Sequence, residues 1–320
     1  MELKRLPFPG AYILGAPDPV QSAIVLVSAR GSSPGYEPFK RDTILPSEAP
    51  PGAITHREFK LLLKPERFPT RKALLAFNDL LHAAATKIGV RYDPFDSIDS
   101  QLRIVQFYDT PDQALRKNKL IFRIRQLREG GWPDDSWEVT FKCRVDDVNK
   151  AADFDSSSKF PQQKKKFKEE LLHGGSLGTI TSIYSNNCVL ESPQLNPTVP
   201  ISQFADVFPH VKKLGLDGNA SMTIVNGARV FEIEAKLGSL FFGHHVTAVA
   251  TLAVWARPVP DRFEPLVAEF GWSYHPVPDA KGKEADANAD AFFKAIQLPL
   301  QDWLSGGTTK TALIYGDQGA

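Results

Sequence analysis

Apolar and charged residues alternate along most of the chain between residues 56 and 274, and this pattern predicts a series of short β-strands. In the first, "HREFKLLLK" (56–64), His56, Glu58 and Lys60 share one face, while Phe59 and Leu61 lie on the other. The other strand candidates are 102–110, 120–127, 136–144, 165–172, 228–237, 246–256 and 266–274. Many short strands with few helices indicate an α+β protein, mainly antiparallel β, whose sheet closes on itself or folds as a sandwich.

Two segments have the spacing of helices instead. Leucine, phenylalanine and alanine recur every three or four residues in 70–89, and 287–304 has a helical pattern that Pro299 interrupts or ends. The stretches 145–164 and 173–203 are polar or rich in Ser, Asn and Pro, and we expect them to be connections.

The predicted strands keep their charged residues on one face. Arg123 and Arg125 share a face in "LIFRIRQL", and in "SWEVTFKCR" Glu138, Lys142 and Arg144 share another. The later strands repeat the arrangement with Lys166, Lys168, Glu170, Glu232, Glu234, Lys236 and Glu269.

Two arrangements explain this sorting of charge. In a sandwich, the charged faces would meet solvent. In a closed tunnel they would point inward, and the aromatic-rich faces would pack against helices outside. The charged faces contain almost only Lys, Arg and Glu, which favours the tunnel. A polyphosphate chelated by a divalent ion would neutralise both the cations and the carboxylates inside it.

Composition narrows the class of protein. The chain has 320 residues, 42% apolar and 23% charged, as soluble globular proteins do. A net charge of +1 predicts no bulk attraction to nucleic acid or membranes, so an anion site must come from local clustering. No apolar run approaches the roughly 20 residues of a membrane-spanning helix. The two cysteines, Cys143 and Cys188, form no CxxC pair, which suits a reducing compartment, and we expect a cytoplasmic protein.

Composition also suggests the division of the chain. Residues 1–54 are rich in Pro, Gly and Ser, with one strand-like run at 22–29, and we expect an extension that packs on the main domain. The main domain is predicted at 55–304 and a C-terminal tail at 305–320.

The motifs follow a recognisable order. "HREFK" (56–60) is followed by "FYDTP" (107–111) and Leu115, then by "FRIRQ", "WEVTFK" and "FKEEL". "VAEFGWSYH" and "ANADAFFKAIQ" come last. This order resembles the CYTH superfamily, or triphosphate tunnel metalloenzymes. Its members open with Glu-x-Glu-x-Lys, continue with Tyr-Asp-Thr, Arg-x-Arg, Thr-x-Lys and basic-x-Glu strands, and end with a Glu-x-Glu strand before a helix.

The resemblance implies a closed eight-stranded antiparallel β tunnel that binds a triphosphate, with glutamates holding Mg²⁺ or Mn²⁺. Members cleave inorganic tripolyphosphate or nucleoside and other organic triphosphates. The implied phosphate-binding residues are Lys60, Arg123, Arg125, Lys142 and Lys168, and strand geometry adds Arg144. The candidate metal ligands are Glu58 and Glu269, with Glu170, Glu234 and His56 as further candidates. Glu58 and Lys60 are the candidate catalytic residues.

Three positions depart from the family pattern. His56 replaces the first glutamate, Gly271 stands where the late strand has its second, and Leu62 replaces a basic residue. An imidazole suits Mn²⁺ or Zn²⁺ better than Mg²⁺. Either the metal preference has changed, or Glu232 or Glu234 substitutes, or the protein binds without cleaving.

Two functions follow as predictions. The first is a metal-dependent phosphohydrolase acting on a triphosphate. The alternative is a catalytically weakened polyphosphate- or nucleotide-binding module. In both, the expected partner is a small anionic triphosphate or polyphosphate, with no nucleic acid and no membrane.

Overall fold

The computed structural model describes residues 52–129, 132–191, 193, 195–260, 262–306 and 309–316, together with three short strands nearer the N-terminus. These strands, β1 (Leu3–Arg5), β2 (Ala11–Leu14) and β3 (Ile24–Leu26), pair antiparallel in a sheet of their own. β3 lies within the run 22–29, where a strand was expected. The other residues before 52 lie outside the described residues, and so does the predicted packing of the extension.

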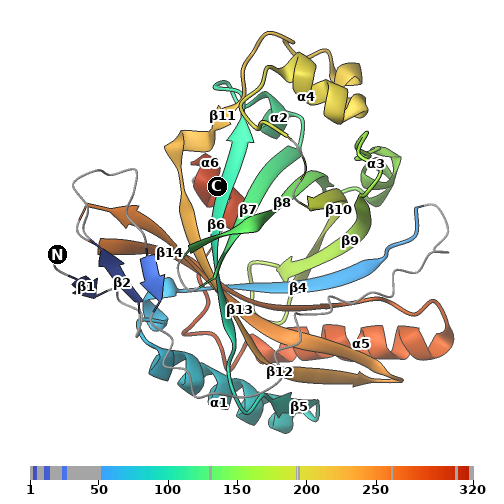
Figure 1. Ribbon diagram of the computed structural model, residues 1–320. Coiled ribbons are helices and arrows are strands. Elements are labelled where there is room, and N and C mark those ends of the chain that lie inside the picture. The colour runs from blue at the N-terminus through green and yellow to red at the C-terminus, as the bar shows by residue number, and fades with distance from the viewer. Residues whose placement is uncertain are drawn as a thin grey trace.

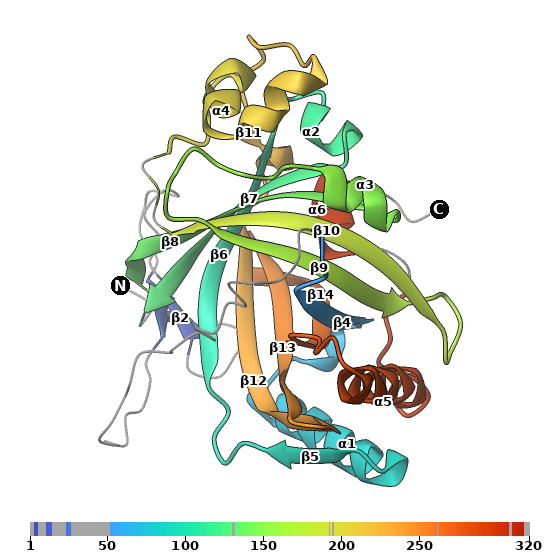
Figure 2. The same cartoon turned by 90° about the vertical axis from the view of Figure 1, so that its right-hand side faces the viewer.

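The second sheet has eleven strands and closes on itself (Figure 1, Figure 2). Its strands are β4 (His56–Leu63), β5 (Arg91–Pro94), β6 (Ser100–Asp109), β7 (Leu120–Glu129), β8 (Trp132–Val145), β9 (Lys164–His173), β10 (Ile180–Glu191), β11 (Thr223–Ile224), β12 (Val230–Gly243), β13 (Val246–Val259) and β14 (Arg262–Tyr274). The order β6-β7-β8-β10-β9-β4-β14-β13-β12 is completed by pairing between β12 and β6, while β5 and β11 add to its edges. Neighbours in this ring are antiparallel except β4 and β9, which are parallel. The predicted mainly antiparallel, closed sheet is confirmed.

One strand of the ring had been predicted as part of a connection. β10 lies between β8 and β9, inside the stretch 173–203, so the ring has nine strands where eight were expected. Its residues Ser185 and Asn187 are buried. The inward positions of most other strands carry charged residues, but in β10 they carry these small polar ones. The sequence of β10 therefore lacks the alternation of charged and apolar residues by which most of the other strands were recognised.

The two long helices correspond to the two predicted ones. α1 (Arg71–Ile88) matches the predicted segment 70–89, with the Thr70 hydroxyl accepting from the Ala73 amide and Gly89 ending the helix at φ 84°. α5 (Ala280–Ile296) begins earlier than predicted, because Asp279 caps its N-terminus by accepting from the Gly282 amide at 2.7 Å. The shorter helices are α2 (Ala114–Lys117), α3 (Val148–Asp153), α4 (Ile201–Val207), α6 (Lys310–Tyr315) and the 3₁₀ turns η1 (Pro65–Arg67), η2 (Pro209–Leu214) and η3 (Val225–Gly227).

Helices cover the apolar outer faces of the ring. α1 and α5 lie along one side of the ring (Figure 1). There Phe293 of α5 packs with Phe59 and Trp272 of the sheet, and Phe77 of α1 packs with Phe270. On the opposite side, Phe204 of α4 belongs to a second core with β7 and β8. Burying each such side chain contributes about 1.5–3 kcal/mol. The aromatic faces therefore point outward and the charged faces inward, as the tunnel hypothesis requires and the sandwich does not.

A buried ion pair attaches α5 to the outside of the ring. Glu169 lies on the mainly apolar face of β9, and it accepts from the Arg57 guanidinium at 2.8 Å. Arg57 also donates to Asp290 of α5 at 2.9 Å and to the Tyr274 hydroxyl at 3.1 Å. The three partners satisfy a cation that is 9% exposed, so this outward charge is structural.

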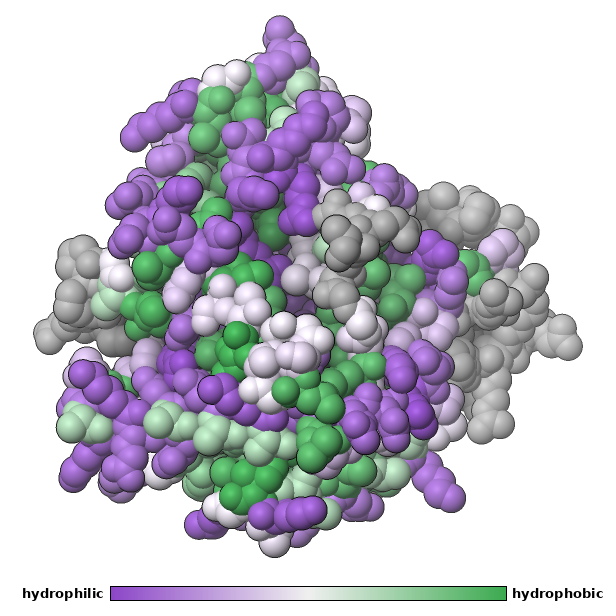
Figure 3. All heavy atoms as spheres, turned by 180° about the vertical axis from the view of Figure 1, so that it is seen from behind, coloured by the Kyte–Doolittle hydropathy of each residue, from purple (hydrophilic) through white to green (hydrophobic). Residues whose placement is uncertain are grey.

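The outer surface carries a mixture of polar and apolar residues. On the face shown in Figure 3, hydrophilic residues predominate in the upper part, and apolar residues lie in several separate groups. The large apolar side chains exposed among the described residues are Leu75, Phe95, Trp132, Leu177, Val249, Val277, Leu298 and Leu313. Among the helices of the described residues, none is both long enough and apolar enough to span a membrane.

Candidate functional site

The inside of the ring is a cavity of about 1990 Å³, lined by charged, polar and apolar side chains. This volume exceeds the range of about 300–1,000 Å³ typical of small-molecule pockets. Strand pairing brings the inward residues into rows: Arg125 faces Glu138, Arg123 faces Thr140, and Lys142 faces Asn187. The cavity is therefore lined by the charged faces that the sequence predicted.

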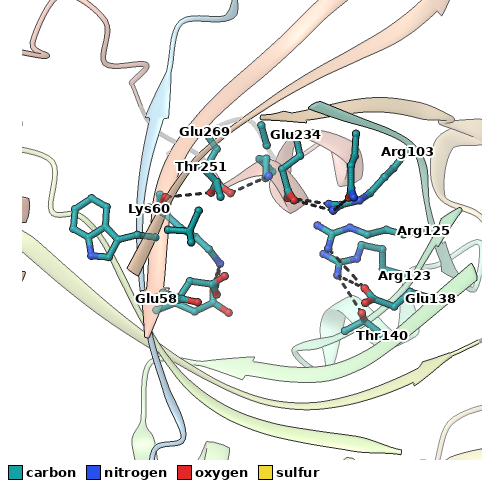
Figure 4. Close-up of a pocket in the computed structure, with 18 of the residues that line it drawn as sticks. Glu58, Lys60, Arg103, Arg123, Arg125, Glu138, Thr140, Glu234, Thr251 and Glu269 are labelled. Carbon is teal, nitrogen blue, oxygen red and sulfur yellow. Dashed lines mark hydrogen bonds and ion pairs between the residues drawn. The ribbon is translucent and has the colours of Figure 1, made fainter. Parts of the chain in front are cut away.

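Arginines and lysines of β7 and β8 form one wall of the cavity, which we call the basic wall (Arg123, Arg125, Lys142 and Arg144). Figure 4 shows Arg123 and Arg125 beside Glu138 and Thr140, across the cavity from Glu58 and Lys60. Arg123 donates to the Thr140 hydroxyl at 3.1 Å. The Glu138 carboxylate is 3.8 Å from both guanidinium groups, which is beyond hydrogen-bond distance. Arg125 also lies 3.5 Å from Glu232, so both arginines have carboxylate neighbours only at long range.

The basic wall also contains donors that lack acceptors. In the described part of the chain, the Nε atoms of Arg123, Arg125 and Arg144 are buried and have no hydrogen-bond partner. Leaving a buried donor unpaired costs about 1–3 kcal/mol, and more where the group is charged. An unpaired buried donor calls for an acceptor, which a ligand, an ion or an ordered water can supply.

Burial weakens the charge of two cations in this wall. Burial and the neighbouring Arg144 lower the pKa of Lys142 to about 7, although Glu170 at 3.5 Å acts in the opposite direction. Burial and the like charge of Arg125 lower the pKa of Arg123 to about 10. A bound polyanion would reverse both effects.

The opposite wall, formed by β4 and β9, contains a tightly paired cluster, and Glu170 links this cluster to Lys142 and Arg144 of the basic wall. Glu58 contacts Lys60 at 2.8 Å and Lys168 at 3.1 Å, and Lys60 continues to Glu170 at 3.0 Å. Burial alone would raise the pKa of Glu58, but Lys168 and Lys60 hold it well below its ordinary value. Glu58 and Lys60 are therefore close together, as predicted, but each already has an ionic partner.

Glu170 is the centre of this cluster. Its carboxylate accepts from Arg144 at 2.9 Å and from the Ser185 hydroxyl at 2.8 Å, and its side chain is 1% exposed. Burial would raise the pKa of Glu170, yet Arg144, Lys142 and Lys60 keep it well below the usual range. With all these donors around it, Glu170 orients the cations of the site.

A third group of charges joins β6, β12, β14 and α6. Arg103 donates to both oxygens of Glu234 at 2.8 Å and to Glu232 at 3.1 Å. Lys310, the first residue of α6, contacts Glu269 at 2.9 Å. Burial would raise the pKa of Glu232, but Arg125, Lys310 and Arg103 lower it.

α6 fills one part of the tunnel with apolar side chains. Ile314 and Tyr315 pack with Phe107, Ile121 and Trp255. Phe107 and Ile121 point into the tunnel, because they lie on the same strand faces as Arg103 and Arg123. The tail predicted at 305–320 thus includes a helix that brings Lys310 into the charged region.

The five predicted metal ligands do not form one site. Glu58 stands opposite Ser273 on β14, and Glu269 stands opposite Leu62 on β4. Four residues of strand therefore separate the two, about 13 Å along the sheet. The neighbours of Glu58 and Lys60 across β14 are Ser273 and Gly271, which supply no carboxylate. Among the described residues, no group of three or more His, Cys, Asp or Glu is placed to hold a metal ion.

The chemistry of the carboxylates agrees with their geometry. Glu58, Glu170, Glu234 and Glu269 each carry a lysine or arginine within 3.1 Å. A divalent ion would have to displace these cations before it could bind. The donor set therefore does not fit the divalent metal that the CYTH resemblance implies.

His56 lies at the edge of the cavity in its neutral form. Burial, followed by the charge of Lys168, lowers its pKa to about 3. Its Nδ1 atom is 2.8 Å from the Thr55 hydroxyl, and its ring lies 4.3 Å from that of His275.

Sequence reasoning missed two cations of the site. Arg103 occupies the inward face of β6, whose next inward positions are Val105 and Phe107, so that face looked apolar. Lys310 lies in a six-residue helix, too short to produce a periodic pattern. The one local clue was Thr309, which caps α6 by accepting from the Ala312 amide at 3.3 Å.

Comparison with known proteins gives a loose structural likeness. No protein-family profile matches the chain, and neither does any curated protein sequence. Among solved structures, the chain is similar to a candidate adenylyl cyclase from Hippeastrum, which is described as having a dominant triphosphatase activity. The two chains are 12% identical, the match covers 82% of this chain and 96% of that one, and the TM-score is 0.40. A candidate adenylate cyclase from Bacillus halodurans follows, with 9% identity, coverage of 80% and 95%, and a TM-score of 0.34. A Pyrococcus horikoshii protein has 11% identity, coverage of 82% and 99%, and a TM-score of 0.33. These superpositions are too loose to assign a family or a function.

Proposed function

We propose that the tunnel binds a triphosphate or a longer polyphosphate along its basic wall. The observation that carries the proposal is the set of buried guanidinium Nε donors of Arg123, Arg125 and Arg144, which have no acceptor among the described residues and line a large cavity. Arginine binds phosphate oxygens in pairs, so a phosphate chain supplies the acceptors that these donors lack.

The spacing of the cations favours a chain of phosphates over a single one. Arg123 and Arg125 are two residues apart on β7, and Lys142 and Arg144 are two apart on β8. Positions two apart on a strand lie about 7 Å from one another, and Arg123 and Lys142, which are diagonal neighbours across the two strands, lie about 7–8 Å apart. A tripolyphosphate can therefore contact several cations at once, whereas orthophosphate can contact one or two.

Hydrolysis of the bound triphosphate is the second candidate function. The Glu138 carboxylate lines the cavity 3.8 Å from both Arg123 and Arg125, next to the proposed phosphate site, where it is placed to accept a proton from water. The predicted catalytic pair, Glu58 and Lys60, lies on the opposite wall with its charges already paired. Binding is the better supported function, because it requires no rearrangement of these carboxylates.

Thermal melting and phosphate release test the two functions together. We expect tripolyphosphate to raise the melting temperature more than equal concentrations of orthophosphate or sulfate, because a ligand of the folded state stabilises it. Arg125→Ala should remove most of this shift, and Arg257→Ala, a change at an exposed arginine on β13, should preserve it. Release of orthophosphate that stops in Glu138→Gln would establish hydrolysis. No shift with tripolyphosphate in the native chain would refute the binding proposal.

A further inference from the structure

The ammonium group of Lys310 lies beside Glu269, the predicted metal ligand on β14. Lys310 contacts Glu269 at 2.9 Å and Glu232 at 3.6 Å, and its Nζ lies 4.9 Å from the centre of the Trp255 ring. Its side chain is 13% exposed. The charge is therefore held on three sides, by two carboxylates and by an aromatic face.

The position of Lys310 is fixed by the helix that carries it. Thr309 caps α6, and Ile314 and Tyr315 of the same helix are buried against inward side chains of the ring. The apolar packing thus places the ammonium group at the end of the charged region. Lys310 is therefore held in a fixed position in the wall of the cavity.

Glu269 has its closest cation in this lysine, while Lys60 also attracts it from a greater distance. Glu232 also accepts from Arg103 and from the Trp255 indole at 2.7 Å, so it keeps donors when Lys310 is removed. Glu269 contacts Lys310 at 2.9 Å. In this group of charges only the pair of Arg103 with Glu234 is closer, at 2.8 Å. Without the ammonium, Glu269 would face the cavity as a carboxylate and repel an entering polyanion.

We propose that Lys310 is a tethered cation that takes the place of a divalent metal ion, so that the tunnel binds its triphosphate in the metal-free form. The proposal rests on the proposed function, because it concerns how the same ligand is held. Lys310 is a binding residue in this account: it neutralises Glu269 and adds positive charge to the cavity. Lys60 and Lys168 neutralise Glu58 in the same way. Arg103 does so for Glu234.

Calorimetric titration of the full chain with tripolyphosphate, in EDTA and in Mn²⁺, tests this role. For the native chain, we expect Mn²⁺ to give no gain in affinity, and to weaken apparent binding as far as it chelates free tripolyphosphate, because cations already occupy Glu58, Glu170, Glu234 and Glu269. Lys310→Met should weaken binding in EDTA by about tenfold or more, the loss typical of one charged contact. Mn²⁺ should then restore much of the affinity, because Glu269 has been released. In the absence of tripolyphosphate, electron paramagnetic resonance should detect Mn²⁺ bound to this variant and not to the native chain.

Three further variants separate the role of the charge from effects on folding. Lys310→Arg should retain metal-free binding, and Lys212→Met, at an exposed lysine paired with Asp206, should leave it unchanged. In Lys310→Met combined with Glu269→Gln, metal-free binding should recover in part and the gain of Mn²⁺ binding should disappear.

The outcomes distinguish this inference from the proposed function. A native chain that binds tripolyphosphate only with Mn²⁺, or a Lys310→Met variant weakened equally with and without Mn²⁺, would overturn the tethered-cation role and leave the binding function intact. A native chain that binds no tripolyphosphate under either condition would overturn both.

Discussion

Individual side chains of the tunnel differ in how well they are paired. The glutamates of the opposite wall have cations at hydrogen-bond distance, for example Glu58 with Lys60 at 2.8 Å. Arg123 and Arg125 instead have carboxylate contacts of 3.5 Å or longer and buried Nε atoms without an acceptor in the described part of the chain. Weakly neutralised, largely buried cations with unpaired Nε–H donors are unfavourable for stability, which is why we ascribe this arrangement to ligand binding.

The first prediction concerns Arg123. Arg123→Ala should weaken tripolyphosphate binding by about 1.5–3 kcal/mol, as expected for loss of a charged hydrogen bond. The melting temperature of the free protein should stay the same or rise, because the change removes a crowded cation. Calorimetry and thermal denaturation measure the two effects, with Arg257→Ala as the control. Unchanged affinity would remove Arg123 from the site.

The second prediction concerns pH. The pKa of Lys142 is lowered to about 7, so above pH 7 the free protein increasingly carries a neutral amine at this position. A bound polyanion favours the charged form and raises the pKa, so binding takes up a proton above pH 7 and affinity falls as pH rises. Titration in buffers of different ionisation enthalpy measures the uptake.

Lys142→Met provides the matched control for this pH effect. The ligand also titrates near neutral pH, and its contribution persists in the variant. Only the difference between the two proteins reports on Lys142, and equal proton uptake in both would contradict the assignment. His56 should contribute nothing above pH 5, because its pKa is about 3.

At the scale of elements, β14 approaches β4 closely at Gly271. A Cβ at this position would collide with the Phe59 carbonyl oxygen of β4. The glutamate that the family pattern has here therefore cannot be restored by simple substitution. The absence of that carboxylate is part of the way the two strands pack.

The third prediction follows from this contact. Gly271→Ala should lower the free energy of unfolding by about 1–3 kcal/mol, the range for overpacking a tight site. Gly306→Ala is the control, because no atom lies within 4 Å of its added Cβ. Denaturant unfolding of the two variants measures the difference. Equal stabilities would show that the strands can separate to admit a side chain.

Most elements of the fold could be predicted from local patterns. The eight predicted strands and the helix at 70–89 are present, because alternation and helical spacing report directly on which face is buried. β10 could not be recognised, since its inward Ser185 and Asn187 bond within the structure instead of repeating a charged pattern. The start of α5 was missed because its first turns are polar, and only the Asp279 cap marks it.

At the scale of the whole molecule, closure of the ring turns separate charged faces into one cavity. The residues predicted to bind phosphate line it: Lys60, Arg123, Arg125, Lys142, Arg144 and Lys168. Which cation pairs with which carboxylate could not be predicted, because the partners come from distant segments. Lys310 and Glu269 are the clearest case, since a short helix and a strand must both be placed before their contact exists.

A structure of the full chain with bound tripolyphosphate tests the central claim most directly. We predict phosphate density between the β7 and β8 side chains of the basic wall, with oxygens within hydrogen-bond distance of Arg123 and Arg125. Density confined to the exposed lysines Lys164 and Lys165 on β9, with the basic wall unchanged, would contradict the account.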